Sequence, residues 1–500
     1  MSSNARLIPW ACSFALVAAC NGIVGIEGVY EGSRPGAGGA QAEGGAKAED
    51  GGDGNGGGDA KPTGGSSALG GEGPSPSAGD GSGAGDGSGG APQPATGRVT
   101  GHVIDFWRHP LANIPVQIGD TLATTDKNGA FTVEDVPETY DVSMVYTYTS
   151  LFQVAAWAYL GLTRRDPVLQ MYVGSERRSG DLDITFVPKP TLGANQKIAV
   201  AIGGADGANT YDPVAASGTS EFPDWYGPAT ASQTGHGLLW QTNAQKLPTS
   251  YVAYKSALLQ LGETATTTLT LDLTPSSIAS GNIQGTVTPA GFATRHNLMF
   301  LRFTSNATLQ LVSESGAADA FSYLAPSIPN STLMLAATEG SAFERYAVAY
   351  ADGLAHGAKP ALTIPTPMTP AAPSSGTTNV DGNTRFSFGG ATPGPYVVNF
   401  YSQDPDDPNA PASRYQTIYV VTANKQFMLP TFLGGGFTLY PNRRYIWTVA
   451  THGAYDSIDA LANEDGFLDP FSWDEETAQG PSREQGAFTD SDILELRTAP

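Results

Sequence analysis

Short runs in which apolar and polar residues alternate recur from about residue 97 to the end of the chain. Arg98–Asp105 alternates with a period of two, and the apolar residues of Ile114–Ile118 share one face of the next run. Helical periodicity is nearly absent, and Gly, Pro, Asn and Asp separate the runs. The pattern predicts an all-β fold made of tandem β-sandwich domains.

The turn at Asn128–Gly129 is the strongest local signal in the first unit. An Asn-Gly pair is typical of a type I′ turn, which needs positive φ at both central residues. We therefore expect a hairpin here, with Phe131 and Val133 pointing inward on its return strand.

Breaks between the runs divide the β-rich part into four predicted units. Gly281–Val287 repeats the spacing of Gly97–Val103, which favours a second sandwich of related type, and the Pro-rich Pro365–Pro373 marks a further boundary. The last unit loosely resembles a fibronectin-type or immunoglobulin-like domain at Tyr445-x-Trp-x-Val. The predicted units are 97–190, a β-rich domain at 191–278, a sandwich at 279–365, and 366–500.

The first unit carries a specific series of motifs. They are Gly101-x-Val-x-Asp, Pro110-Leu-Ala-Asn-x-Pro-Val, Thr125-Asp-x-x-Gly-x-Phe and Val136-Pro. This order resembles the carboxypeptidase regulatory-like domain, a transthyretin-like sandwich. The resemblance implies an accessory module rather than a peptidase, because the chain lacks the zinc-binding catalytic module of that family.

The first twenty residues do not show the alternating pattern of the β units. An apolar run, Leu7–Ala19, ends in Leu16-Val-Ala-Ala-Cys20, which resembles the lipobox of bacterial lipoproteins. The resemblance implies that 1–19 is a signal peptide and that Cys20 carries diacylglycerol and an N-acyl chain such as palmitate. Asn21, rather than Asp, follows the cysteine, so we expect a Gram-negative outer membrane location on the periplasmic or cell-surface side. An ordinary signal peptide with an incidental cysteine is the alternative.

Between the anchor and the β units, residues 20–96 are dominated by Gly, Ala, Ser, Asp and Pro. This segment has almost no large apolar residue to offset the entropy of ordering, so we expect a disordered linker. The chain has two Cys, and cleavage would remove Cys12. The mature protein would then have no intramolecular disulfide.

The net charge of the chain limits the classes of partner that it is expected to bind. The formal net charge is −22, with 26 basic and 48 acidic residues. Nucleic-acid binding requires a basic surface, so the charge argues against it. The expected partners are the membrane, through the lipid, and a polysaccharide or another envelope protein.

The sequence contains few residue patterns that indicate catalysis or metal binding. The six histidines form no zinc-binding pair, and there is no nucleophile elbow or phosphate-binding loop. Carboxylates in loops suit calcium, with solvated loop charge as the simpler reading and no other cofactor expected. The calcium candidates are Asp404, Asp406, Asp407, Glu464, Asp465 and Asp469.

Aromatic residues are the other candidates. Trp225, Tyr226 and Trp240 lie in a Gly-, Pro- and Thr-rich stretch, where they would either stack on sugars or anchor loops as buried residues. The sequence thus predicts a lipid-anchored, non-catalytic envelope protein for adhesion, polysaccharide binding or scaffolding. The alternatives are a hydrolase with its site within 191–365 and a purely structural surface spacer.

Overall fold

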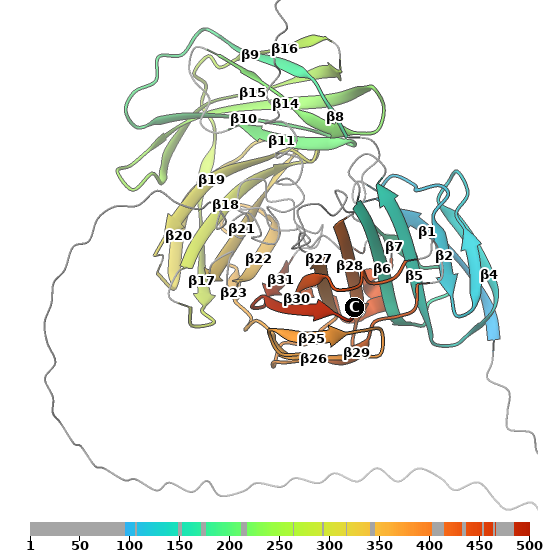
Figure 1. The fold of residues 1–500 in the computed structure, drawn as a ribbon. Coiled ribbons are helices and arrows are strands. Elements are labelled where there is room, and N and C mark those ends of the chain that lie inside the picture. Colours follow the sequence, from blue (N-terminus) through green and yellow to red (C-terminus); the bar gives the residue numbers. More distant parts are fainter. Residues whose placement is uncertain are drawn as a thin grey trace, which may run out of the picture. The chain divides into compact units, whose positions relative to one another are not determined.

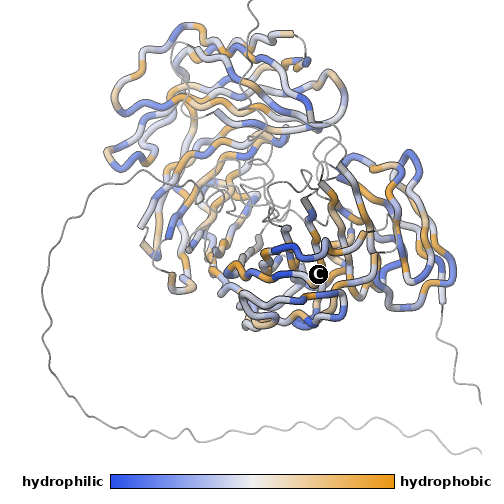
Figure 2. The backbone as a smooth tube through the Cα atoms, viewed as in Figure 1, coloured by the Kyte–Doolittle hydropathy of each residue, from blue (hydrophilic) through white to orange (hydrophobic). Residues whose placement is uncertain are grey.

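The described part of the chain is built almost entirely of β-strands (Figure 1). The computed structural model describes residues 96–105, 108–148, 153–171, 177–211, 218–263, 265–292, 295–316, 318–340, 346–402, 415–432, 437–452, 455–463, 466 and 485–500. Backbone contacts divide the chain into two units, Met1–Tyr30 with Pro94–Pro500 and Glu31–Gln93, and the described residues all belong to the first. Hydrophobic and hydrophilic positions alternate along many strands (Figure 2), as the sequence pattern predicts.

The first sandwich consists of two sheets around one core. Its strands are β1 (Thr96–Ile104), β2 (Pro115–Ile118), β3 (Thr121–Thr124), β4 (Ala130–Pro137), β5 (Tyr140–Tyr148), β6 (Gln153–Leu162) and β7 (Val168–Gln170). β1 runs antiparallel to β4 and parallel to β7. Val99 and Val103 of β1 are fully buried in the same core as Trp157 of β6. Phe131 and Val133 of β4 are buried with them, which confirms their predicted inward positions.

The turn at Asn128–Gly129 differs from its prediction. It joins β3 to β4, but β3 pairs with β2 and β4 pairs with β1, so the two strands form no hairpin. Gly129 has a φ of 74°, whereas Asn128 is not among the residues with positive φ. The Asp126 carboxylate accepts backbone hydrogen bonds from Asn128 at 2.8 Å and Ala130 at 2.9 Å. An Asx turn therefore carries the chain from one sheet to the other.

The second unit also has sheets on both sides of a core. Its strands are β8 (Arg177–Ser179), β9 (Asp181–Val187), β10 (Gln196–Gly204), β11 (Gly207–Tyr211), β12 (Thr219–Glu221), β13 (Asp224–Tyr226), β14 (Thr230–Thr242), β15 (Pro248–Gly262) and β16 (Thr266–Asp272). The sequence places β9 in the first unit, but β9 pairs with β12 and β16. Leu182 and Ile184 of β9 are buried with Ile198 of β10. Since β8 also pairs with β13, the boundary between the first two units falls before Arg177 rather than at 190.

The third unit repeats the strand pairing of the first. Its strands are β17 (Ser280–Thr288), β18 (Arg295–Phe303), β19 (Thr308–Ser315), β20 (Ala320–Pro326), β21 (Ser331–Gly340), β22 (Tyr346–Leu354) and β23 (Ala361–Thr363). β17 runs antiparallel to β20 and parallel to β23, as β1 does with β4 and β7. The spacing that Gly281–Val287 shares with Gly97–Val103 thus corresponds to a shared strand topology.

The last unit is rich in buried aromatic rings. Its elements are β24 (Thr369–Ala372), β25 (Thr377–Val380), β26 (Arg385–Gly389), β27 (Tyr396–Ser402), β28 (Tyr415–Thr422), β29 (Gln426–Met428), β30 (Arg444–His452), α3 (Ile458–Leu461), β31 (Gln485–Asp490) and β32 (Leu494–Thr498). Phe386 packs edge-on against Phe400, which stacks on Trp447. Ser457 caps α3, the one helix in the described ranges, by accepting a hydrogen bond from the Ala460 N–H.

Strand pairing joins three of these units into one 14-stranded sheet. β6 of the first unit pairs in parallel with β28 of the last, from Tyr415–Gln153 to Thr422–Leu160, and β22 of the third unit pairs with β31. Both faces of β6 are buried, because Trp157 lies in the core of the first sandwich and Ala158 in that of the last. The units are therefore fused through shared sheets and cores.

Candidate functional site

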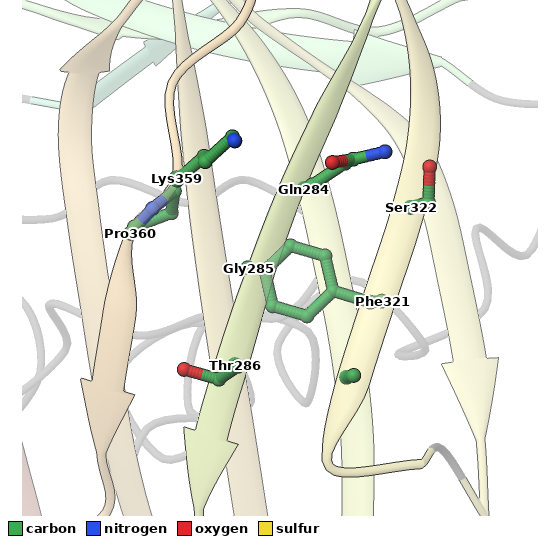
Figure 3. Close-up of a pocket in the computed structure, with 8 residues that line it drawn as sticks. Gln284, Gly285, Thr286, Phe321, Ser322, Lys359 and Pro360 are labelled. Carbon is green, nitrogen blue, oxygen red and sulfur yellow. The ribbon is translucent and has the colours of Figure 1, made fainter.

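An open hollow of about 480 Å³ lies on the third unit, where β20, β17 and the start of β23 run side by side (Figure 3). We call it the Gly285 hollow. It is lined by Gln284, Gly285, Thr286, Ala320, Phe321, Ser322, Lys359 and Pro360. Its volume is in the range of small-ligand sites, although it is open rather than enclosed.

A glycine allows the strands to approach closely at the hollow. A Cβ on Gly285 would lie 2.4 Å from the Phe321 Cζ and 2.6 Å from the Pro360 carbonyl oxygen. Because Gly285 is directly opposite Phe321 in the antiparallel register, the phenyl ring lies over the glycine (Figure 3). Only glycine leaves room for this arrangement.

The neighbouring core holds the phenyl ring in place. The Phe321 ring stacks on Tyr323 at 5.3 Å with an interplanar angle of 14°. The Tyr323 hydroxyl donates a hydrogen bond of 2.5 Å to the Glu314 carboxylate. Burial, and then the hydrogen bond to Glu314, raise the pKa of Tyr323, so the hydroxyl stays protonated and keeps donating. The ring is 8 % exposed and packs in this core, so it lies on the buried side of Gly285.

Polar side chains surround the hollow on the solvent side of the sheet, because neighbouring residues of a strand point to opposite faces. Gln284, Thr286, Ser322 and Lys359 are exposed. Figure 3 shows the side chains of Gln284, Ser322 and Lys359 extending toward the same end of the hollow, with Thr286 nearer the other end. Lys359 forms no ion pair with another residue in the described ranges of the chain.

The first sandwich contains the same backbone arrangement with different charge. A Cβ on Gly101 would lie 2.5 Å from the Phe131 Cζ and 2.6 Å from the Pro167 carbonyl oxygen. The residue before this proline is Asp166, where the third unit has Lys359. Asp166 is paired with Arg164 at 2.9 Å. The glycine, phenylalanine and proline thus belong to the shared fold, whereas the charge distinguishes the third unit.

Sequence reasoning did not find this hollow. Its residues come from three segments between positions 284 and 360, and none belongs to a recognisable binding motif. The available signal was the repeated Gly281–Val287 spacing, combined with a phenylalanine and a proline at matching places in both units.

The aromatic candidates chosen from the sequence lie elsewhere. Trp225 and Trp240 are fully buried, in two different cores, so neither ring offers a face to a sugar. The Trp225 Nε1 donates to the Pro228 carbonyl at 2.8 Å, which is the behaviour of a loop anchor. Tyr226 is half-buried in β13, which pairs with β8. The interpretation of Trp225 and Trp240 as stacking residues is wrong, because neighbouring sheets cover them.

The other predicted site residues lie outside the described residues. They are Cys20, Asp404, Asp406, Asp407, Glu464, Asp465 and Asp469. Within the described ranges, no group of three or more His, Cys, Asp or Glu side chains is placed to hold a metal ion. No helix in those ranges has the length and apolar character needed to cross a bilayer.

A second polar cluster joins the second and third units. His236 of β14 places Nε2 2.8 Å from the Ser305 Oγ and Nδ1 3.0 Å from the Tyr254 hydroxyl. The imidazole stacks on Phe303 at 3.8 Å and is 6 % exposed. Burial lowers the pKa of His236 to about 4, so the ring is neutral at pH 7.

This cluster contains a possible base, His236, and a possible nucleophile, Ser305. A neutral imidazole whose Nδ1–H donates to Tyr254 can accept the Ser305 hydroxyl proton at Nε2. Its low pKa makes it a weak base, which reduces the catalytic value of the pair. The same hydrogen bonds also link β14 to the turn between β18 and β19, which is a structural role.

Comparison with known proteins gives only distant likenesses. No family model and no curated protein matches the chain. The TIE protein of Bacillus anthracis is 10 % identical over 54 % of this chain and 50 % of its own, with a TM-score of 0.14. The shaft pilin SpaA from Lactobacillus rhamnosus GG is 8 % identical over 38 % and 98 %, with a TM-score of 0.13. Domains FN1–FN3 of chicken CNTN1 are 9 % identical over 82 % and 100 %, with a TM-score of 0.12.

Proposed function

We propose that this chain is a lipid-anchored envelope protein that presents fused β-sandwiches as a non-catalytic binding surface. The observation that carries the proposal is the Gly285 hollow, an open depression surrounded by the exposed polar side chains of Gln284, Thr286, Ser322 and Lys359. The continuous sheet supports it, since shared strands keep the unit that bears the hollow in a fixed frame. Adhesion and polysaccharide binding both need such a surface, and scaffolding is the related role for an envelope-protein partner.

The anchor is the part of the proposal that depends on sequence. Acylation of Cys20 with more than one chain would hold the protein stably at a membrane, because a single chain binds only marginally. We expect metabolic palmitate labelling of the expressed chain, loss of that labelling in Cys20→Ser, and unchanged labelling in Cys12→Ser. Recovery of the wild-type chain with the outer membrane fraction would support the location. Equal labelling of the wild type and Cys20→Ser would contradict the anchor.

Binding can be tested with the full chain in detergent. We expect it to co-sediment with a polysaccharide fraction of the envelope or extracellular matrix. Retention on no fraction by a folded, self-associating protein would favour the structural spacer instead. Repeating the assay, together with a melting curve, in calcium and in chelator tests the predicted calcium sites. A melting temperature that ignores both would contradict them.

A hydrolase remains the second candidate, because His236 and Ser305 are in contact within 191–365. In this case Ser305 would attack an ester carbonyl while the His236 Nε2 accepts the hydroxyl proton and then returns it to the leaving alkoxide. A fluorophosphonate probe should then label the wild type and leave Ser305→Ala unlabelled. Absence of labelling in the folded wild type would remove this candidate.

A further inference from the structure

We propose that two copies of this chain associate through the outer edge of β15, which pairs antiparallel with itself about a twofold axis at Ser256. The inference goes beyond the proposed function, since it concerns the second unit and needs neither the Gly285 hollow nor the lipid anchor. Three observations carry it: an uncovered strand edge, the symmetric limits of that edge, and the side chains that the pairing brings together.

The outer edge of β15 is not covered by a neighbouring strand. The order of this sheet is β11-β10-β14-β15, and β15, with 15 residues, is the longest strand in the described ranges. In the opposite sheet, β16 lies over β14 rather than beside β15, because a Cβ on Gly235 of β14 would lie 2.6 Å from the Leu269 Cδ2 of β16. Such an edge presents N–H and C=O groups that another strand can pair with.

The register of β14 and β15 shows which backbone groups face outward. The Ser232 carbonyl of β14 points toward β10, since a Cβ on Gly204 of β10 would lie 2.6 Å from its oxygen. Ser232 is opposite Gln260, so these two residues form a non-hydrogen-bonded pair, and the Gln260 N–H and C=O point away from β14. By alternation, the outward groups of this part of β15 belong to its even-numbered residues.

Two internal contacts limit the free part of this edge. The Val252 carbonyl accepts a hydrogen bond from the Ser276 N–H at 2.8 Å. At the other end, the Gln260 carbonyl accepts one from the Thr267 hydroxyl at 2.8 Å. No backbone hydrogen bond in the described ranges reaches the outward groups of the three even-numbered residues between these limits. Ser256 lies midway, so antiparallel pairing of two copies about Ser256 uses the whole free edge and disturbs neither limit.

This pairing places compatible side chains opposite each other. Leu258 is 86 % exposed, and it would lie opposite Tyr254 of the second copy. The Tyr254 hydroxyl is 3.0 Å from the His236 Nδ1, which holds the ring in place. Lys255 points to the other face of the sheet and would lie opposite Ala257, so no like charges are directly paired. Each dimer thus gains two aromatic–aliphatic pairs of the kind that stabilise neighbouring strands.

Disulfide trapping tests the register. The full chain is used in detergent with Cys12→Ser and Cys20→Ser, so that an introduced cysteine is its one thiol. Ser256→Cys should form a disulfide-linked dimer, because residues in a hydrogen-bonded pair have Cα atoms about 5.5 Å apart, within disulfide range. Gln260→Cys is the control, since its two copies would lie roughly 27 Å apart along the strands, and it should crosslink at least about tenfold more slowly. Equal crosslinking of the two variants would overturn the inference.

Proline substitutions test the backbone pairing in the same thiol-free chain, by sedimentation equilibrium over a range of concentrations. Ser256→Pro removes an outward N–H and leaves the ladder with β14 intact, so the protein should fold and lose the dimer. Gln260→Pro also removes an outward N–H, but beyond the free edge, and should keep the dimer. A starting chain that stays monomeric at every concentration, or a Ser256→Pro dimer as stable as the original, would overturn the inference.

A charge substitution tests the side-chain contacts by the same measurement. Leu258→Asp should weaken dimerisation about tenfold, since both Leu258–Tyr254 pairs are lost. Phe222→Asp is the control, because it adds the same charge at an apolar residue that is 70 % exposed outside β15, and it should leave the dimer unchanged. Equal weakening by both variants would indicate general charge repulsion and contradict the proposed pairing.

These outcomes are separate from those of the proposed function. Dimers trapped at Ser256 in a chain that no envelope fraction retains would keep this inference and reject the binding role. Retention of the chain on an envelope fraction, with no crosslinking at Ser256, would keep the binding role and reject the dimer.

Discussion

Two buried histidines show how packing sets the chemistry of single residues in this chain. Burial lowers the pKa of both His236 and His452 to about 4, well below the usual value for histidine. His236 is 6 % exposed and His452 is 5 % exposed. Both rings are therefore neutral in the folded protein under conditions in which an unfolded chain would already protonate them.

The difference in histidine pKa between the folded and unfolded states predicts that the free energy of unfolding falls at pH values above those at which carboxylates titrate. A pKa depressed on folding gives stability that is present at pH 7 and is lost as the pH falls from about 6.5 toward about 4, because the unfolded state gains protons first. At pH 5 the loss should be about 2 kcal/mol for each histidine. We expect the urea midpoint, followed by tryptophan fluorescence, to fall between pH 7 and pH 5.

Variants identify the source of this pH dependence. His236→Gln should remove its share of the change between pH 7 and pH 5. Tyr254→Phe removes a hydrogen-bond partner but leaves the imidazole buried, so it should lower stability at both pH values while keeping the pH dependence. A His236→Gln protein with the full wild-type dependence would show that His236 does not carry this effect.

At the scale of elements, the third unit depends on how closely β17 and β20 can approach. Alternation of apolar and polar residues defines each strand, but only the lack of a side chain at Gly285 leaves room for the Phe321 ring and the Pro360 carbonyl. Ile283 and Val287, the buried neighbours of Gly285 on β17, hold the register. A one-residue slip would turn both of them toward solvent.

Gly285→Ala should therefore destabilise the protein by about 1–3 kcal/mol, the typical effect of overpacking. Gly382→Ala is the control, because a Cβ there meets nothing within 4 Å, and its effect should stay within about 0.5 kcal/mol. Chemical denaturation of each variant gives the comparison. The double variant Gly285→Ala/Phe321→Leu should recover part of the loss relative to the sum of its single variants, because leucine lacks the clashing Cζ. Strict additivity would contradict the proposed clash.

At the scale of the whole molecule, the units are linked by more than the connecting chain. Val420 of β28 and Ala158 of β6 are paired neighbours in the parallel junction, and both are fully buried. Trp157 stacks on Tyr419 at 5.3 Å across the same junction. Because the two strands share hydrogen bonds and cores, a substitution that destabilises one strand should also destabilise the other.

Val420→Asp should test this coupling. An unpaired carboxylate in the junction should cost about 3–5 kcal/mol. Hydrogen exchange should then increase in both 153–162 and 415–422, although only the second contains the substitution. Leu258→Asp is the control, since Leu258 is 86 % exposed on β15 and its replacement should leave both segments protected. Exchange that increases in 415–422 alone would contradict the shared sheet as a cooperative unit.

The sequence by itself determined the fold class and many strand positions, because alternation and turn residues are local properties that need no knowledge of neighbours. Phe131 and Val133 lie inward as their spacing predicts, and the repeated Gly281–Val287 spacing identifies a real repeat of strand topology. The anchor at Cys20 stays a prediction from sequence.

Only the tertiary structure decided which strands pair and what covers each side chain. β9 joins strands far along the chain, Trp225 and Trp240 lie beneath neighbouring sheets, and β6 is shared by two units. The hollow and the His236–Ser305 contact likewise join residues distant in sequence. The physical reason is that hydrogen bonding between strands and burial of side chains depend on long-range packing. One local pattern of apolar and polar residues is compatible with several strand pairings.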